Sequence, residues 1–423
     1  MKDKNSKIST YIYLIFILSG TIKPLFLYYD VTLYFDITLV SCLLLIIIII
    51  INNKYSKVIF ENGNLVLRSF LLFCIWYLFT LVYSISEIYS ISKWFLFTLN
   101  IIAFSYPLFV TIDLRLFIRA FVIAILISSC WFLVLYIQYI SFASNQFESI
   151  IGGSLSLSNL LGIISIILVT SKEKVFSDLG VRIFIVLSLA IIGLLGARGP
   201  IIVAYGLIFV YFLYRIICSI QNTVIFNNYI IKNKIRTKSI LLIIGVILLL
   251  ILVNLYFEEN ISYFVDRSVS RLSLIFSENR GNIDEMGESV TARVILMQSA
   301  TKYLSDDFVH FLVGYGIGSF GLLFNNVDGR FFPHNIVLEI GVEAGFIGII
   351  LLIAFFIQII MLSTSQKKYI SIYVVIYLIL FSLHSGSLVD SREMFAFLAM
   401  YLLKENEKSN RNILQKNISN VRY

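Results

Sequence analysis

The chain has 423 residues, of which 59% are hydrophobic and 14% are charged, and its formal net charge is +8 at pH 7. Soluble globular domains carry about a quarter charged residues, so this composition excludes a water-soluble core as the main unit of the fold. The positive charge does not require a nucleic-acid partner, because basic residues beside membrane spans produce the same excess. We therefore expect an integral membrane protein that contacts membrane lipid and binds no nucleic acid.

Apolar runs long enough to cross a bilayer recur along the whole chain. A span needs about 17 to 25 apolar residues, and it must be helical because lipid cannot hydrogen-bond the backbone. These rules predict an all-α membrane fold with about twelve transmembrane helices in a single polytopic domain, residues 1–423. The predicted spans are residues 11–29, 32–51, 65–84, 92–110, 117–140, 154–170, 181–197, 200–217, 239–256, 335–361, 369–385 and 390–403.

Basic residues are divided unequally between the two sides of this predicted bundle. With a cytoplasmic N-terminus, 23 of the 33 Lys and Arg residues lie on or beside the cytoplasmic face, which is the orientation that the positive-inside rule favours. Both termini are then cytoplasmic, with residues 404–423 as a tail. The connection between the ninth and tenth spans, residues 257–333, becomes one large extracytoplasmic loop.

The predicted loop 257–333 contains apolar residues at helical spacing. Residues 290–304 show this pattern around Arg293, and a similar pattern upstream carries Arg271. Both predict amphipathic helices that lie on the outer membrane face. The glycine-rich run 314–318 has no strand before it and no suitably spaced acidic residue after it, so we interpret it as a tight turn and not as a dinucleotide site.

Two arginines reach the predicted outer side at separate places in the chain. Arg198 follows the seventh span and precedes Gly199, which permits close approach of a ligand to the backbone. The planar guanidinium donates paired hydrogen bonds to anionic oxygens, which suits a pyrophosphate. Arg293 is the second candidate, with Arg271 as its rival. An anchor at the bilayer edge is the alternative interpretation of Arg198.

His334 lies where the large loop meets the tenth span. A neutral imidazole accepts a proton from a hydroxyl group at neutral pH, which is the role of a general base; a histidine of the membrane interface without a chemical role is the alternative. Asn335 is predicted to cap the following helix. Glu343 lies about 10 Å further along this helix, where a carboxylate is functional or pairs with a base. The histidine spacings do not fit zinc, so no metal or cofactor is expected.

Three motifs, in this order, resemble the O-antigen polymerase and O-antigen ligase superfamily of bacterial surface polysaccharide assembly. They are Gly196-Ala197-Arg198-Gly199, the run from Gly314 to Phe320, and the run from Pro333 to Glu339 that continues into residues 343–348. The resemblance covers residues 190–360. The chain departs from the family pattern at Ala197, where a serine is common, and at Met297, where an aromatic residue often follows the loop arginine.

The resemblance implies a metal-independent glycosyltransferase, similar in fold to the C-type enzymes, in the bacterial inner membrane with a periplasmic active site. It implies that His334 activates the acceptor hydroxyl and that Arg198 and Arg293 hold the donor pyrophosphate. Donor and acceptor are then oligosaccharides on undecaprenyl pyrophosphate, and a chain-length regulator protein is a further expected partner. The predicted function is an O-antigen polymerase, or the polymerase of a related surface polysaccharide.

Two alternatives remain open at this point. The first is an O-antigen ligase that transfers glycan to lipid A core, which the sequence does not distinguish from a polymerase. The second is a flippase or transporter of lipid-linked oligosaccharide. A transporter is expected to show related halves or interrupted helices near the membrane midplane, and the asymmetric loop 257–333 argues against it.

Overall fold

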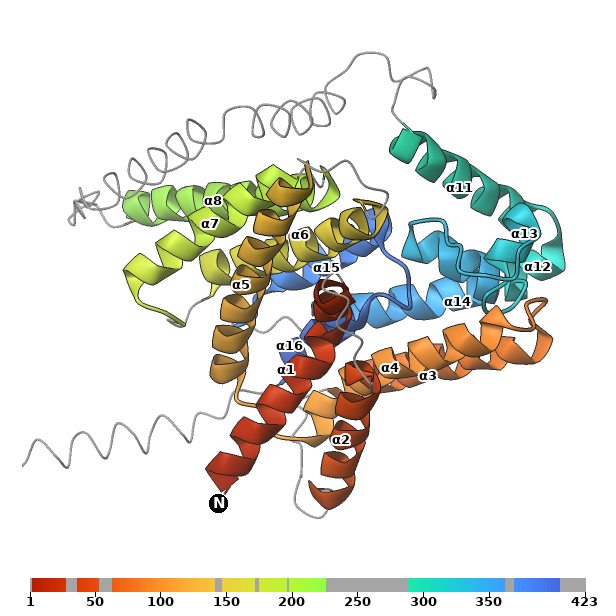
Figure 1. The fold of residues 1–423 in the computed structure, drawn as a ribbon, viewed down its shortest axis with the longest axis horizontal. Coiled ribbons are helices and arrows are strands. Elements are labelled where there is room, and N and C mark those ends of the chain that lie inside the picture. Colours follow the sequence, from red (N-terminus) through yellow and green to blue (C-terminus); the bar gives the residue numbers. More distant parts are fainter. Residues whose placement is uncertain are drawn as a thin grey trace, which may run out of the picture.

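The computed structural model describes residues 2–27, 36–52, 63–140, 147–171, 175–195, 198–225, 288–361 and 369–403. The regular elements in these ranges are all helices (Figure 1), which confirms the predicted all-α fold for the described part of the chain. The predicted span 239–256, the predicted helix around Arg271 and the tail 404–423 lie outside the described residues.

Each predicted span within the described ranges overlaps a helix. These helices are α1 (Lys2–Leu27), α2 (Ile37–Asn52), α3 (Gly63–Phe79), α4 (Tyr89–Phe109), α5 (Leu114–Ile140), α6 (Phe147–Thr170), α7 (Asp178–Leu195), α8 (Arg198–Ile225), α14 (Ile336–Met361), α15 (Ile372–Ser385) and α16 (Arg392–Leu402), and the 3-10 helix η1 (Thr80–Tyr83) extends α3. Four stretches are long and apolar enough to cross a membrane, namely Leu65–Tyr83, Tyr89–Phe109, Leu114–Phe132 and Ile336–Met361, and four shorter apolar helices accompany them. A total of twelve spans stays a prediction.

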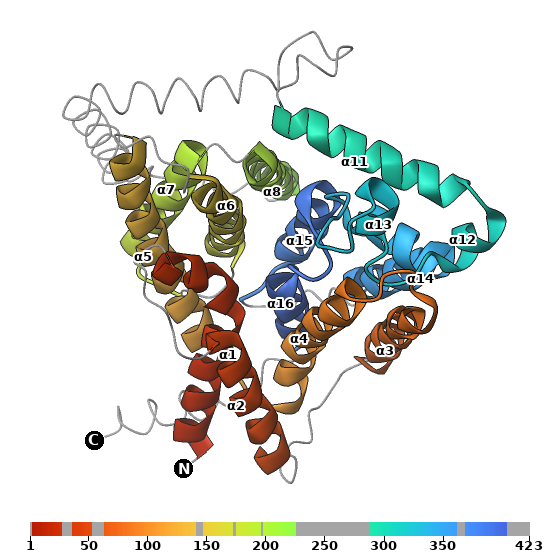
Figure 2. The same cartoon turned by 45° about the vertical axis from the view of Figure 1, so that its right-hand side comes forward.

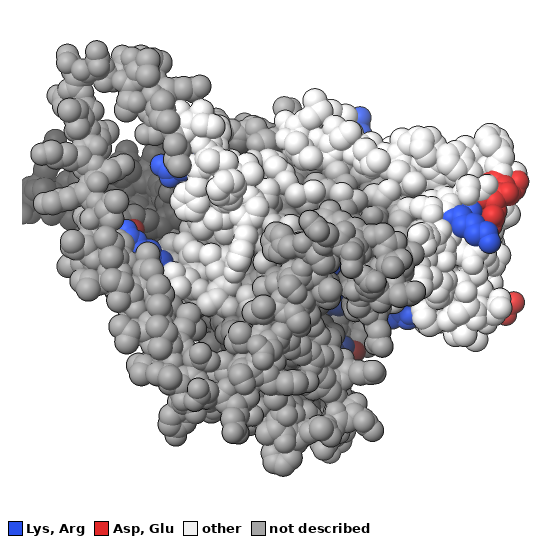
Figure 3. Space-filling model, turned by 90° about the horizontal axis from the view of Figure 1, so that it is seen from above, with Lys and Arg blue, Asp and Glu red and all other residues white. Residues whose placement is uncertain are grey.

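The helices pack around aromatic side chains and expose apolar ones. The ring centroid of Phe70 lies 4.1 Å from that of Phe104 and 5.2 Å from that of Phe355, which joins α3, α4 and α14. Large apolar side chains are also exposed, among them Ile50 and Phe209, and most of the described surface in Figure 3 is neither basic nor acidic. Such a surface suits lipid, and together with the apolar helices it identifies a multi-pass membrane protein.

Helix α14 is interrupted at Gly345, whereas the sequence analysis treated this span as continuous. Gly345 has φ 67° and ψ −169°, which lies outside the helical region. Residues of the glycine-rich run fill the gap: the N–H of Tyr315 donates to the carbonyl oxygen of Val342 at 2.8 Å, and the N–H of Gly316 donates to that of Glu343 at 3.0 Å. The carbonyl groups released by the break are therefore hydrogen-bonded, as a membrane interior requires.

The glycine-rich run forms the predicted tight turn. Gly314, Gly316 and Gly318 all have positive φ, at 79°, 91° and 80°. A Cβ on Gly316 would lie 2.2 Å from the Cα of Ser84, so only glycine lets this turn approach the connection between η1 and α4. The turn thus fixes residues 314–318 against both α14 and the α3–α4 connection.

The described part of the large loop folds into α11 (Glu288–Ser305), α12 (Phe308–Val313) and α13 (Phe320–Asn325). Figures 1 and 2 show these helices beside one end of α14. The side chain of Leu304 packs against Gly341, and the hydroxyl of Tyr303 donates to the carbonyl of Leu323. The predicted helix around Arg293 is confirmed, and it covers the end of α14 where the candidate site begins.

Candidate functional site

A cavity of about 530 Å³ lies among α1, α4, α6, α15, α16 and the segment that precedes α14. Its lining includes Thr21, Asn159, Arg330, His334 and residues 385–387 and 389–394. In the predicted topology, the ends of α1 and α15, the starts of α6 and α16 and the large loop all belong to the extracytoplasmic side. The cavity therefore occupies the end of the bundle at which the sequence analysis placed the site.

Several buried polar atoms that line this cavity have no hydrogen-bond partner among the described residues. They are Nδ1 of His334, Oδ1 of Asn159, Oγ of Ser385 and Nε of Arg392. Buried polar groups are nearly always hydrogen-bonded, and an unpaired one costs about 1 to 3 kcal/mol. A cavity that gathers four such atoms is suited to a polar ligand that supplies the partners.

His334 occupies a constrained position at the edge of α14. Its φ of 55° lies in the left-handed region, which is uncommon outside glycine, and its ring packs 4.5 Å from that of Phe332. Burial, and to a smaller extent the positive charge of Arg293, lower the pKa of His334 to about 4, while Asp390 opposes the shift. The imidazole is therefore neutral at neutral pH, with one ring nitrogen free to accept a proton.

Arg293 lies on α11 and is not among the described residues that line the cavity. Its side chain is partly buried, and burial lowers the pKa of its guanidinium. Because its charge acts on His334, these two predicted residues lie in one electrostatic environment. Arg271, the rival of Arg293, lies outside the described residues.

Asn335 confirms the predicted helix cap. Its Oδ1 accepts from the N–H groups of Val337 and Leu338 at 3.0 and 3.1 Å, which satisfies two donors at the start of α14. Its Nδ2 donates to the carbonyl oxygen of Leu383 at 2.7 Å. This side chain thereby fixes the backbone next to His334 and ties it to α15.

Arg198 is the first residue of α8, and its side chain lies outside the described part of the structure. Its neighbour Gly199 faces the ring of His384, because a Cβ on Gly199 would lie 3.1 Å from Cδ2 of that ring. Leu383, which precedes His384, accepts the hydrogen bond from Asn335. The starts of α8 and α14 therefore meet at the same turn of α15, which places the backbone of Arg198 on the His334 side of the bundle.

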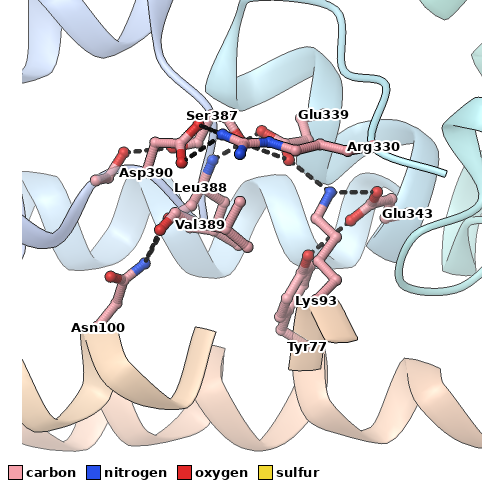
Figure 4. Close-up of polar contacts among 11 residues, drawn as sticks. Tyr77, Lys93, Asn100, Arg330, Glu339, Glu343, Ser387, Leu388, Val389 and Asp390 are labelled. Carbon is pink, nitrogen blue, oxygen red and sulfur yellow. Dashed lines mark hydrogen bonds and ion pairs between the residues drawn. The ribbon is translucent and has the colours of Figure 1, made fainter. Parts of the chain in front are cut away.

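Glu343 belongs to a buried ionic network next to the cavity (Figure 4). Nζ of Lys93 lies 2.5 Å from Oε1 of Glu339 and 2.6 Å from Oε1 of Glu343. The hydroxyl of Tyr77 donates to Oε2 of Glu343 at 2.6 Å. All four side chains are fully buried, and Glu343 is not among the described residues that line the cavity. Of the two interpretations of Glu343, the structure shows the pairing with a base.

Segment 386–391, the connection between α15 and α16, forms one wall of the cavity and is held from two helices. Oε2 of Glu339 accepts from the N–H of Leu388 at 2.8 Å, and Nδ2 of Asn100 donates to the carbonyl of Leu388 at 2.6 Å. At the mouth, Nη2 of Arg330 lies 2.7 and 2.6 Å from the two carboxylate oxygens of Asp390. Figure 4 shows these contacts as one connected set.

The sequence analysis did not assign a role to four charged residues near the cavity, namely Lys93, Arg330, Asp390 and Arg392. Three of them, Lys93, Asp390 and Arg392, lie at the start of a predicted span. This position could have marked them as paired or functional, because charged residues are costly in lipid unless they pair. The partner of Lys93 lies 246 residues away and that of Arg330 lies 60 residues away. Among the residues that the structure describes, no group of three or more His, Cys, Asp and Glu is arranged to hold a metal ion.

The charge of Arg293 provides a direct test of this geometry. We expect Arg293→Gln to raise the pKa of His334, because the substitution removes a positive charge that opposes protonation. The titration of His334 by NMR of histidine-labelled protein in micelles measures the change, with the signal assigned through His334→Gln. Lys302→Gln is the matched control, since Lys302 is an exposed base on the same helix. Equal shifts in both variants would contradict a specific influence of Arg293.

The same pKa has a consequence for stability. The pKa of His334 lies below its ordinary value of 6.5 in the folded protein, so between the two values the unfolded chain binds more protons. His334 therefore contributes to stability above pH 6.5, and this contribution is lost as the pH falls through about 4. Arg293→Gln should raise the pKa of His334 in the folded protein, so the pH range over which stability depends on His334 should begin at a higher pH.

One comparison with known families finds a match, and it covers the central part of the chain. Residues 183–353 match the family model described as O-antigen ligase. The match is less than half of the chain, and it runs from α7 to α14 across the large loop. It contains Arg198, Arg293, His334 and Glu343. No curated protein shows significant similarity to the chain.

Proposed function

Because residues 183–353 form a region of the O-antigen ligase family, we propose that the chain is a glycosyltransferase that moves a lipid-linked glycan onto a hydroxyl group. The observation that carries this proposal is His334, a neutral imidazole that lines the cavity and whose Nδ1 has no hydrogen-bond partner among the described residues. Such a ring takes the proton of a hydroxyl as the new glycosidic bond forms.

The proposed donor is an oligosaccharide on undecaprenyl pyrophosphate. The acceptor hydroxyl gives its proton to His334, its oxygen bonds to the anomeric carbon, and the bond from that carbon to the pyrophosphate breaks. The bonding electrons leave with the pyrophosphate, and Arg198 and Arg293 neutralise its growing charge. An anion beside Arg293 also offsets the charge that lowers the pKa of His334, so a bound donor makes the ring a stronger base.

We propose a second lipid-linked repeat as the acceptor, so that the enzyme polymerises O-antigen or a related surface polysaccharide. The reaction would take place on the periplasmic face of the inner membrane, with a chain-length regulator as a partner. The order of the three motifs supports glycosyl transfer in general and is shared by the polymerase and ligase alternatives. The exposed apolar helix surfaces, including Ile50 and Phe209, suit the polyprenyl tails of both substrates.

The description of the matching family favours a second candidate, an O-antigen ligase that transfers the finished glycan to lipid A core. The donor, the base and the pyrophosphate-binding arginines are the same in both reactions. The acceptor alone differs, and it enters a cavity whose described lining combines polar and apolar side chains and does not identify a sugar. A genetic test therefore separates the two candidates.

In a strain that lacks this protein, we expect the core to carry single repeats and no long chains, because polymerisation fails while ligation continues. Gel analysis of surface polysaccharide measures this result. Wild-type protein should restore the long chains, whereas His334→Ala should not. A bare core would favour the ligase, and an unchanged ladder in the deletion strain would reject both candidates.

The structure bears on the transporter alternative through the interruption of α14. Interrupted helices in transporters present free backbone groups to a substrate. At Gly345, the N–H groups of Tyr315 and Gly316 already occupy the carbonyl groups next to the break, and Gly345 is not among the described residues that line the cavity. The break accommodates the glycine-rich turn and offers no free backbone group to a substrate at these carbonyl groups, so it does not favour the transporter alternative. Vesicles in which purified protein moves lipid-linked repeats without joining them would reverse this conclusion.

A further inference from the structure

We propose that Glu339 is a positioning residue for the cavity, which holds segment 386–391 in place with Lys93 as its counter-ion. The inference rests on the proposed function in taking this cavity as the place of glycosyl transfer. Glu339 is itself fully buried and is not among the described residues that line the cavity. Any effect it has on the reaction must therefore pass through its neighbours.

Glu339 bonds directly to the segment that forms the cavity wall. Its Oε2 accepts from the backbone N–H of Leu388 at 2.8 Å, and its Oε1 accepts from the hydroxyl of Ser387 at 3.1 Å. Asn100 binds the carbonyl oxygen of the same Leu388. Both backbone groups of Leu388 are thus fixed by buried side chains of α14 and α4, which is unusual for a residue in a connection between helices.

Lys93 keeps Glu339 in the form that these bonds require. An ionised carboxylate accepts hydrogen bonds more strongly than a neutral group, but burying it without a counter-ion is costly. Lys93 lies 2.5 Å from Glu339 and is itself fully buried. The ammonium group stabilises the carboxylate, and the carboxylate in turn binds the backbone of Leu388.

The position of segment 386–391 determines where two cavity residues stand. The N–H of Asp390 donates to the carbonyl of Ser387 at 3.2 Å, so the turn transmits the position of Ser387 to Asp390. Asp390 pairs with Arg330, which lies four residues before His334. A displacement of the segment would therefore move Asp390 and Arg330, which both line the cavity, without removing any group from the lining.

The chain contains a matched control for this proposal in Glu343. It lies one turn further along α14, is equally buried and contacts the same Lys93. Its second oxygen accepts from Tyr77, and among the described residues it has no hydrogen bond or ion pair with segment 386–391. Both carboxylates contact Lys93, and they differ in their other partners: Glu339 binds the segment, whereas Glu343 binds Tyr77.

The experiment compares Glu339→Ala, Glu339→Gln and Glu343→Gln in purified protein, with the lipid-linked repeat from a deletion strain as substrate. We expect Glu339→Ala to lower kcat by about 10²-fold, the effect of misplacing a reacting group by about 1 Å. Glu339→Gln keeps an acceptor for Leu388 and should lose less. Glu343→Gln should lose less than Glu339→Gln. Equal losses in the two Gln variants would overturn the proposal, because charge alone would then explain them.

A second readout reports on the segment and does not depend on activity. Val389 is buried in the cavity wall, so Val389→Cys in a background without the native cysteines reports exposure of the segment to a water-soluble maleimide. Labelling should be faster with Glu339→Gln or Glu339→Ala than with Glu343→Gln. Wild-type labelling in folded Glu339→Gln protein would refute the positioning role.

The two readouts also separate this inference from the proposed function. If the Glu339 variants label faster while His334→Ala still transfers glycan, the positioning of the segment stands and the catalytic assignment of His334 fails. If His334→Ala is inactive while the Glu339 variants label and react like wild type, the proposed function stands and the positioning role fails. Glu339→Gln preserves the side-chain volume, so both measurements can be made with this variant if Glu339→Ala does not fold.

Discussion

Replacement of His334 by alanine is expected to lower the rate of glycan transfer by about 10²- to 10⁴-fold, which is the usual effect of removing a general base. The expectation follows from the neutral ring, its unpartnered Nδ1 and its place in a cavity with three other unpartnered polar atoms. The assay measures release of undecaprenyl pyrophosphate from lipid-linked repeats by purified protein in vesicles. His334→Gln should be equally impaired, because an amide does not act as a base at neutral pH.

His310→Gln is the matched control for this prediction. His310 lies on α12, its Nδ1 is 3.1 Å from the carboxylate of Asp307, and its ring stacks 4.0 Å from that of Tyr315. It lies outside the described lining of the cavity, so the variant should retain wild-type turnover. Full activity of His334→Ala, or an equal loss in His310→Gln, would contradict the assignment of the base.

Gly345→Ala is expected to prevent accumulation of folded protein. A Cβ at this position would lie 2.2 Å from the carbonyl oxygen of Leu312. The backbone of Gly345 also has a positive φ, which glycine adopts easily and other residues rarely adopt. Such a conformation costs other residues about 1 to 3 kcal/mol, and overpacking adds about 1 to 3 kcal/mol. The hydrogen bonds of Tyr315 and Gly316 prevent the turn from moving away. Size-exclusion chromatography and thermal melting in detergent measure the loss.

Gly206→Ala controls for a glycine substitution within the same protein. Gly206 lies inside α8, and a Cβ there would meet no atom within 4 Å. Alanine is a better helix former than glycine by about 1 kcal/mol, so this variant should melt at or above the wild-type temperature. A Gly345→Ala protein with wild-type stability would show that the break in α14 is not required.

Hydropathy was sufficient to predict the helices because lipid leaves the backbone no other way to satisfy its hydrogen bonds. It was not sufficient to predict the break in α14. Glycine at position 345 is compatible with a continuous transmembrane helix, and the break depends on the turn at residues 314–316, which packs into it from a distant part of the chain. The local signal in that turn, its repeated glycine, did predict its own conformation.

In the candidate site, too, features that depend on neighbouring residues could be predicted, and features that depend on distant residues could not. Asn335 could be predicted as a helix cap because capping depends on neighbouring residues. His334 could be identified as a candidate because it lies next to that cap, where the loop meets the helix. The pairs Lys93 with Glu339 and Arg330 with Asp390 join residues far apart in the chain. Periodicity and composition contain no information about such pairs, so the support behind the cavity wall became apparent only in three dimensions.

A cross-link between positions 198 and 334 tests most directly whether these two residues lie close together at one extracytoplasmic cavity. The measurement uses Arg198→Cys with His334→Cys in a background without native cysteines, and a short membrane-impermeant reagent applied to intact spheroplasts. We predict an intramolecular cross-link without permeabilisation, because the starts of α8 and α14 meet at the same turn of α15. Single labelling of each cysteine from opposite sides of the membrane, without a cross-link, would contradict the account.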